Sequence, residues 1–276
     1  MTQDDRVPDT AQELAGGRLL AWQEPGGVAH LRFNNPDRLN AMSLAMWEGL
    51  GDTCAALAED GDVRIVVLSG AGGRAFVSGA DISEFGEART GAEAAARYNA
   101  AVARAEAALA ALPMPSLAAI RGYCIGGGLG IALRCDLRLC TEGARFAIPA
   151  AKLGLGYGPD GVEALARVVG PSVAADMLFS ARQIGAEAAQ RAGLVNQVLA
   201  GDEFDAAVEQ TAGRIAGNAP LTLRAVKAAL QDLRRPEAER DPARVQALVA
   251  ACFDSADYRE GQAAFAEKRR PEFRGA

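Results

Sequence analysis

Three consecutive glycines, Gly126 to Gly128, stand where the apolar stretch GYCI gives way to the helix-forming stretch LGIALR. Glycine weakens both strands and helices, by about 0.5–1 kcal/mol for each residue relative to alanine, so three in a row do not serve local stability. A backbone without side chains allows another group to come close to its N–H groups. We therefore expect this stretch to be approached by a ligand through its main chain.

Side chains that usually carry out nucleophilic or metal chemistry are few in this sequence. His30 is the only histidine, and it alternates with Leu31 and Phe33 in the stretch VAHLRF, which is typical of an ordinary strand residue. A Ser-His-Asp or Cys-His site would have to use this one imidazole, and a histidine-rich zinc site is excluded. The five cysteines lie in apolar stretches and form no C-x-x-C pair, which indicates buried free thiols and no metal site: Cys54, Cys124, Cys135, Cys140 and Cys252.

Composition limits the partners. The chain of 276 residues carries 29 Lys and Arg against 35 Asp and Glu, and its formal net charge of −6 argues against nucleic-acid binding. Residues 1–15 are acidic and polar, unlike a signal peptide, and predict a disordered leader. The alanine-rich run at 100–120 contains charges and prolines, so it does not predict a membrane span. We expect a cytoplasmic protein with reduced thiols.

The segment GAGGRA at 70–75 fits the degenerate G-x-G-x-x-A pattern of dinucleotide-binding loops. That pattern requires a helix to open inside it and hold a pyrophosphate at its N-terminus, but FVSGADI follows instead. We therefore interpret the segment as a turn.

Hydrophobic periodicity predicts an α/β core over 16–200 and a helical region over 201–276. The core begins with a strand, a helix capped by Ser43 and a second, buried strand. A long helix follows, which ends before Pro113, and then one further strand leads into the glycines. The predicted strands cover 28–33, 64–70, 116–125, 136–141 and 144–148, and the predicted helices cover 43–60, 91–112 and a short segment from 126.

Two motifs at this spacing, RAFVSGADISEF and GYCIGGG, resemble those of the crotonase superfamily, the enoyl-CoA hydratases and isomerases. The resemblance extends from about residue 28 to the C-terminus. It implies a superhelix of ββα units with a helical C-terminal trimerisation region, an acyl-CoA thioester as the ligand, and a homotrimer or dimer of trimers. Coenzyme A would enter as part of the substrate, and no other cofactor is expected.

By this resemblance, the backbone N–H groups of Ala80 and Gly127 form an oxyanion hole. Attack on a thioester, or removal of a proton beside it, places negative charge on the carbonyl oxygen, and losing one of two such donors costs about 10²–10³ in rate. Gly127 also starts a helix, whose positive dipole end favours an enolate. A tight strand-to-helix turn is the alternative explanation of the glycines.

The resemblance also implies coenzyme A contacts in the core and at the end of the last helix. Phe265 and Lys268 would reach the nucleotide bound by a neighbouring subunit, although Lys268 could equally be a solvated charge. Asp81 has a second explanation, because Asp81 and Glu84 fit a capping box at the start of a helix. The implied contacts are Arg38, Ser78, Gly79, Ala80, Asp81, Gly126, Gly127, Phe265 and Lys268.

Both glutamates that the hydratases of the family use are replaced here. The first position, two residues after the glycines, is Gly130, and the second, after Pro149, is Ala150. Each general acid or base contributes about 10²–10⁴ in rate, so a hydratase without them should be slow. Asp160 and, after it, Tyr157 are candidate replacements, but Asp160 and Glu163 also fit a capping box.

Three functions stay open on these residues. The first is an acyl-CoA enzyme of the hydratase/isomerase type with unusual acid and base residues. The second is an acyl-CoA decarboxylase or thioesterase on the same fold, because decarboxylation creates the enolate as CO₂ leaves and needs no base. The third is an acyl-CoA-binding protein without catalysis. Turnover of crotonyl-CoA would distinguish the first from the others.

Overall fold

Two β-sheets form the core of the structure, a computed structural model that describes residues 7–81 and 92–276. The larger sheet has the strand order β1-β2-β3-β4-β6-β8-β11, and the smaller has the order β10-β9-β7-β5. In the larger sheet β1 to β3 pair antiparallel, whereas β3, β4, β6, β8 and β11 run parallel. Its strands are Gln12–Leu14, Leu19–Glu24, Val28–Phe33, Ile65–Gly70, Ser116–Ile120, Leu137–Thr141 and Gln197–Leu199.

Each successive strand–strand–helix unit contributes one strand to each sheet. The strands β4, β6 and β8 enter the larger sheet, and the strands that follow them, β5, β7 and β9, enter the smaller one. This arrangement is the expected superhelix of ββα units. The smaller sheet consists of β5 (Ala75–Val77), β7 (Tyr123–Ile125), β9 (Arg145–Ala147) and β10 (Ile184–Gly185).

The single strand predicted over 116–125 is wrong, because the structure divides it into β6 and β7, which lie in different sheets. The chain turns between them at Gly122, whose φ is +61°. A Cβ at this position would lie 1.9 Å from the carbonyl oxygen of Arg74. Only glycine fits such a turn, but the apolar sequence on either side hides it from a periodicity analysis.

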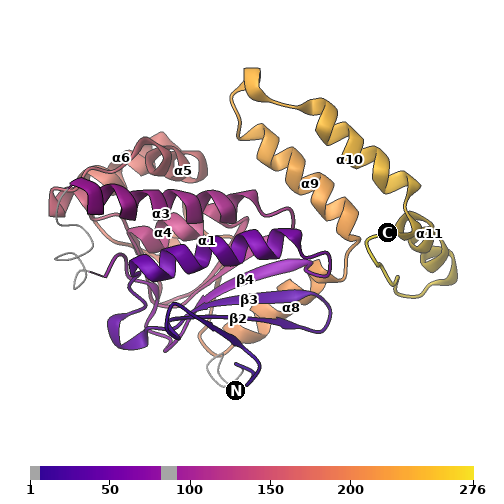
Figure 1. The fold of residues 1–276 in the computed structure, drawn as a ribbon, viewed down its shortest axis with the longest axis horizontal. Helices are drawn as coiled ribbons and strands as arrows, with labels where there is room; N and C mark the ends of the chain where they lie inside the picture. Colours follow the sequence, from indigo (N-terminus) through magenta and orange to yellow (C-terminus); the bar gives the residue numbers. More distant parts are fainter. Residues whose placement is uncertain (1–6, 82–91) are drawn as a thin grey trace.

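Helices cover both faces of the larger sheet (Figure 1). On one face α1 (Leu44–Glu59) and α3 (Ala92–Ala111) pack over α4 (Gly127–Arg134), around a core that includes Trp47 and Phe76. Ser43 caps α1 as predicted, since its Oγ accepts a hydrogen bond of 3.2 Å from the N–H of Met46. On the opposite face α8 (Phe204–Ala216) packs on Val67 and its neighbours, and thus extends the core beyond residue 200.

The last three helices project away from the sheets, as Figure 1 shows. They are α9 (Pro220–Leu233), α10 (Pro242–Asp254) and α11 (Ala256–Glu267), and we call them the C-terminal arm. Lys227 attaches the arm to the core, because its ammonium group contacts Asp136 although its side chain is only 3% exposed. Gln231 adds hydrogen bonds of 2.8 and 3.1 Å to the carbonyl oxygens of Ala110 and Leu112.

Two shorter helices, α5 (Pro159–Val169) and α6 (Pro171–Ser180), lie between β9 and β10 in the sequence, and a third, α7 (Ala186–Arg191), lies between β10 and β11. Regular secondary structure begins closer to the N-terminus than the sequence predicts. Strand β1 falls inside the expected disordered leader of residues 1–15 and pairs with β2. Residues 1–6 of that leader are outside the described residues.

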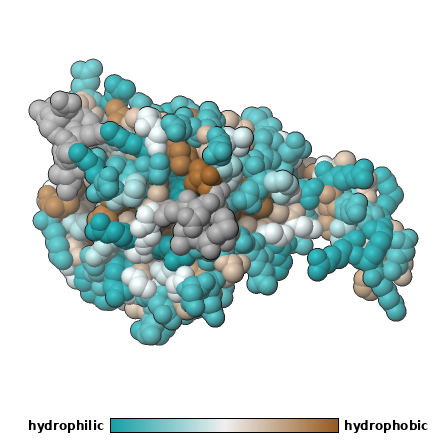
Figure 2. Space-filling view, turned by 90° about the horizontal axis from the view of Figure 1, so that it is seen from below, coloured by the Kyte–Doolittle hydropathy of each residue, from teal (hydrophilic) through white to brown (hydrophobic). Residues whose placement is uncertain are grey.

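The surface seen in Figure 2 is mostly hydrophilic, with hydrophobic residues in small separate groups. Within the part of the chain that the structure describes, no helix combines the length and the apolar character needed to cross a membrane.

Candidate active site

Two segments predicted to form the site lie at the carboxyl ends of neighbouring strands. β5 and β7 are parallel partners, with Val77 opposite Cys124, and they lead into residues 78–81 and 126–128. A Cβ on Gly126 would lie only 3.8 Å from the Cα of Gly79. The structure therefore brings together the two motifs, which are more than forty residues apart in sequence.

The backbone N–H groups of Ala80 and Gly127 differ from those of the residues next to them. Among the described residues neither is paired, whereas the adjacent N–H groups of Asp81 and Gly126 donate to the carbonyl oxygens of Met42 and Ala147, at 2.9 and 2.8 Å. Gly127 is the first residue of α4, where a helix leaves its N–H groups without internal partners. The same end of the helix carries a partial positive charge.

Packing and conformation explain each of the three glycines. Gly126 has a φ of +56°, which favours glycine, and a Cβ on Gly128 would lie 2.2 Å from the carbonyl oxygen of Val77. A Cβ on Gly127 would lie 3.0 Å from Cζ2 of the buried Trp47. The turn considered as an alternative thus accounts for part of the motif. It does so while leaving the N–H of Gly127 unpaired within the described chain.

Arg38 and Asp81 form an ion pair beside these N–H groups. Nη1 of Arg38 donates to both carboxylate oxygens of Asp81, at 3.0 and 3.1 Å, from the short helix Pro36–Arg38. Arg38 is 54% exposed and Asp81 only 6%, so the carboxylate holds a guanidinium that faces solvent. The capping box predicted for Asp81 and Glu84 lies outside the described residues.

The other residues predicted to contact coenzyme A divide into two groups. Ser78 stands next to the ion pair, where its N–H donates to the carbonyl oxygen of Leu39 at 3.1 Å. Phe265, which is 88% exposed, and Lys268, which ends α11, belong to the projecting arm. Figure 1 shows α11, which carries Phe265 and ends at Lys268, on the side of the arm that faces away from the sheets.

The two positions without glutamate have different surroundings. Gly130 lies within α4 as predicted, and a Cβ there would lie 2.6 Å from Oε1 of Glu106. Ala150 is half-buried at the start of a short 3-10 helix, Ala150–Leu153. Glu106 belongs to no sequence motif. Its only signal in the sequence is a charge within an alanine-rich helix, so motif analysis missed it.

Asp160 does not cap a helix, so the predicted capping box of Asp160 and Glu163 is wrong. Helix α5 begins one residue earlier, at Pro159, with Gly158 as its N-cap. Proline favours the first helical position because it has no N–H to leave unpaired and its φ is already helical. Glu163 instead binds Arg167 one turn later, at 2.6 and 3.1 Å.

Tyr157 is half-buried and is protonated at neutral pH. Its pKa is raised to about 12, mainly by burial and also by the negative charge of Glu106, while the positive charge of Arg134 opposes the shift. The phenol can therefore donate a hydrogen bond or a proton but does not act as a base near neutrality. Its ring packs against Gly161, where a Cβ would lie 2.7 Å from Cζ of the tyrosine.

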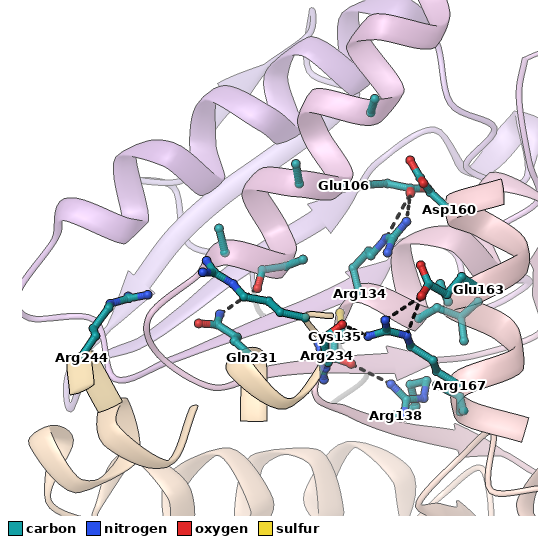
Figure 3. A pocket seen from close by; sticks show the side chains of 18 residues that line it. Glu106, Arg134, Cys135, Arg138, Asp160, Glu163, Arg167, Gln231, Arg234 and Arg244 are labelled. Atoms are coloured by element: carbon teal, nitrogen blue, oxygen red, sulfur yellow. Dashed lines mark hydrogen bonds and ion pairs between the residues drawn. The ribbon is translucent and has the colours of Figure 1, made fainter. Parts of the chain in front are cut away.

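A cavity of about 810 Å³ lies between α3, α4 and α5 on one side and the base of the C-terminal arm on the other (Figure 3). Arginines predominate over acids in its lining, and several of the arginines are paired. Arg134 binds Glu106, and Arg138 donates to carbonyl oxygens. The charged lining residues are Arg134, Arg138, Arg167, Arg234, Arg235, Arg244, Glu106, Asp160 and Glu163.

The residues interpreted as structural lie away from this region or are inert. His30 stacks on Trp22 in the larger sheet, with 4.7 Å between the ring centroids, and burial lowers the pKa of the imidazole. All five cysteines are free, and all but Cys252 are buried, as expected. Gly72 and Gly73 have positive φ and form a turn between β4 and β5, as predicted for GAGGRA.

Comparison with known proteins assigns the family. Residues 23–276 match the family model described as enoyl-CoA hydratase/isomerase. The short-chain-enoyl-CoA hydratase of Clostridium acetobutylicum is 33% identical over 252 residues, which cover 91% of this chain and 95% of that protein. The 2,3-dehydroadipyl-CoA hydratase of Escherichia coli is 35% identical over 248 residues, which cover 90% of this chain and 95% of that protein.

A solved structure agrees with these sequence relatives. The crystal structure of an enoyl-CoA hydratase/carnithine racemase from Magnetospirillum magneticum has a TM-score of 0.87 and 37% identity, covering 94% of this chain and 96% of that one. The likeness in fold and the sequence matches over nearly the whole length agree. The chain belongs to the enoyl-CoA hydratase/isomerase family, within the crotonase superfamily.

Proposed function

We propose that the protein converts an acyl-CoA thioester by stabilising its enolate between the N–H groups of Ala80 and Gly127. The observation that carries this proposal is the pair of unpaired N–H groups on two adjacent segments at the carboxyl ends of β5 and β7. Two preorganised donors at a developing oxyanion lower the barrier by several kcal/mol, since one donor alone is worth about 10²–10³ in rate. The thioester carbonyl oxygen would lie between them.

Coenzyme A recognition would use the core of one subunit and the arm of another. Arg38, held by Asp81, presents a guanidinium for a phosphate group, which arginine binds in a bidentate manner. Phe265 and Lys268 would complete the nucleotide site of a neighbouring subunit. This arrangement requires a homotrimer or a dimer of trimers, and the arm's exposed Leu233 and Phe253, at 64% and 61%, support such an interface.

The reaction we favour is hydration or isomerisation of an enoyl-CoA in the cytoplasm, with acid and base residues that differ from the usual glutamates. The named relatives are hydratases of short-chain enoyl-CoA and of 2,3-dehydroadipyl-CoA. Gly130 and Ala150 provide no carboxylate, so hydration would rely on other groups. Asp160 lines the cavity of Figure 3, and the protonated Tyr157 lies close enough to Glu106 and Arg134 for their charges to affect its pKa.

A crotonase-fold decarboxylase or thioesterase is the second candidate, and the absence of carboxylates at Gly130 and Ala150 favours it. Loss of CO₂ from a malonyl-type thioester leaves an enolate directly, so the two N–H groups suffice. A protein that binds acyl-CoA without catalysis would use the same contacts.

A panel of thioesters tests these functions. Crotonyl-, 3-butenoyl-, methylmalonyl- and acetoacetyl-CoA are incubated separately with the purified protein, and products are identified by mass. A gain of 18 mass units from crotonyl-CoA supports hydration, and loss of CO₂ from methylmalonyl-CoA supports decarboxylation. The proposal of enolate chemistry fails if the thioesters bind and none is converted. The proposal of acyl-CoA binding fails if none binds.

A further inference from the structure

The carboxylate of Glu106 is held in a fixed orientation between two helices. Nε and Nη2 of Arg134 donate to its Oε2 at 3.1 and 2.9 Å. The other oxygen, Oε1, lies 2.6 Å from the position that a Cβ on Gly130 would occupy. Figure 3 shows the Glu106–Arg134 pair on the wall of the cavity, close to the start of α5.

The absence of a side chain at Gly130 leaves space for the carboxylate of Glu106. Gly130 lies inside α4, where glycine costs about 1 kcal/mol relative to alanine. Its φ is not positive, so the backbone itself does not require glycine. What any larger residue would disturb is the oxygen of Glu106. Glycine at position 130 thus lowers the stability of α4, but it leaves space for Oε1 of Glu106.

The carboxylate lies near the proposed oxyanion site. Gly127 and Gly130 are three residues apart on α4, which corresponds to about 4.5 Å along the helix axis, and residues at this spacing share a face. A thioester whose carbonyl oxygen accepts from the N–H of Gly127 would therefore lie beside the face of α4 on which Oε1 contacts position 130. The side chains of Glu106 and Arg134 are 16% and 22% exposed, so the pair remains accessible to a ligand.

We propose that Glu106 is the catalytic base for the α-carbon of the substrate, supplied by α3 instead of α4; this inference rests on the proposed acyl-CoA function. Oε1 takes the α-proton as the C–H bond breaks. The electron pair forms the C=C bond of the enolate, and the thioester oxygen takes the negative charge. When the proton on Oε1 is replaced by one from solvent and that proton is delivered to the α-carbon, the cycle gives exchange; when Oε1 delivers its proton to the γ-carbon of an enoyl thioester, the cycle gives isomerisation.

Arg134 is a positioning residue in this scheme. By binding Oε2 with two donors it fixes the carboxylate plane and directs Oε1 towards the space left by Gly130. The same pair also ties α3 to α4, so a purely structural role for Glu106 has to be separated from a catalytic one. The separation is possible because glutamine has the same shape as glutamate and keeps an oxygen for Arg134.

The experiment measures exchange of the α-protons of butyryl-CoA in D₂O by mass spectrometry, together with the dissociation constant of the same ligand. Butyryl-CoA cannot be hydrated or decarboxylated, so exchange reports proton transfer alone. We expect the wild type to exchange, and Glu106→Gln to lose at least about 10²-fold in kcat, with KM and the dissociation constant within threefold. Glu106→Asp should recover part of the rate.

Glu163→Gln is the matched control, because Glu163 lines the same cavity but pairs with Arg167 on its own helix. It should keep the wild-type exchange rate. Exchange by Glu106→Gln at the wild-type rate would overturn the proposal, as would a wild type that binds butyryl-CoA without exchanging it. Failure of the wild type to bind any acyl-CoA would instead overturn the proposed function. If Glu106→Gln does not fold, a rate for folded Glu106→Asp equal to the wild type's would also count against a catalytic role.

Discussion

Cζ2 of Trp47 lies 3.0 Å from the position that a Cβ on Gly127 would take, so the first residue of α4 lies directly against a buried indole. Nε1 of the indole donates to the hydroxyl oxygen of Tyr98 at 2.9 Å, and that hydroxyl donates to the carbonyl oxygen of Met42 at 3.3 Å. This network leaves the ring little freedom to move. Contact with this restrained ring therefore limits movement of Gly127 and of its N–H group.

Gly127→Val should lower turnover by about 10² or more, because the added side chain pushes the start of α4 away from Trp47 and displaces an oxyanion donor. From the sequence alone we would expect the fold to tolerate valine, but the contact with Trp47 predicts a lower melting temperature as well. The measurements are kcat on the thioester identified by the panel and a thermal melt. Gly143→Ala, at a turn with open space around it, is the control and should change neither. Normal turnover in a folded Gly127→Val protein would refute the oxyanion assignment.

Asp81→Asn should weaken coenzyme A binding about tenfold, which corresponds to about 1.4 kcal/mol. The neutral amide cannot hold the Arg38 guanidinium as the carboxylate does, and charge-assisted hydrogen bonds are about twice as strong as neutral ones. Titration calorimetry with free coenzyme A measures the effect. Asp37→Asn, on the exposed side of the same short helix, should bind like the wild type. If both variants bind coenzyme A with equal affinity, Arg38 does not contribute to nucleotide binding.

The double variant Gly130→Glu with Ala150→Glu should place carboxylates at the two hydratase positions only if the side chain of Glu106 moves or is removed. The sequence predicts that Gly130→Glu stabilises α4, but its Cβ would lie 2.6 Å from Oε1 of Glu106 and bring two carboxylates together. We expect Gly130→Glu alone to cost about 1–3 kcal/mol, as in other overpacked sites. Adding Glu106→Ala should recover this stability. Crotonyl-CoA hydration by the triple variant should exceed the parent's by about tenfold, well below the 10²–10⁴ of a well-placed group.

The decisive comparison is between the double and triple variants, measured by loss of enoyl absorbance and by thermal melts. A double variant as stable as the parent would show that Glu106 moves freely. A triple variant that binds coenzyme A ligands but gains no hydration would mean that positions 130 and 150 do not face the substrate.

Lys227→Met should destabilise the protein by about 3–5 kcal/mol, the usual cost of leaving a buried charge without its partner. Asp136 also accepts hydrogen bonds from the N–H and hydroxyl of Ser116, at 2.8 and 3.0 Å, so the carboxylate cannot turn to solvent. Denaturant unfolding measures the loss. Arg235→Met, at an exposed position just after the same helix, should stay within about 0.5 kcal/mol of the wild type. A similar small change for Lys227→Met would show that water reaches Asp136.

The protein should lose stability as the pH rises above 9. Burial raises the pKa of the Cys54 and Cys135 thiols to about 12, from an ordinary value of 9.0. Below pH 9 both folded and unfolded chains keep these protons. Between pH 9 and 12 only the unfolded chain releases them, which favours unfolding by about 1.4 kcal/mol per pH unit for each thiol. Urea unfolding at pH 8, 9 and 10 measures this slope, and equal stability at all three would contradict it.

Sequence patterns predicted helices and strands where neighbouring residues determine them. They failed where contacts between distant parts of the chain determine the structure. Ser43 and the apolar rhythm of 44–59 specify α1 by themselves, and the paired glycine motifs identify the family. The division of 116–125 between two sheets depends on a contact between Gly122 and Arg74, about fifty residues apart. Glu106 meets Gly130 only because α3 packs on α4, and no spacing in the sequence records that contact.

The two N–H groups of the proposed site belong to the main chain, and this affects how the protein can evolve. A point mutation replaces a side chain but leaves the peptide N–H in place, unless it introduces proline. Changes at positions such as 106, 130, 150 or 160 can therefore alter the proton chemistry of the pocket and keep both donors. A lineage built on this scaffold can lose one reaction and gain another, while every intermediate sequence retains the means to bind a thioester enolate.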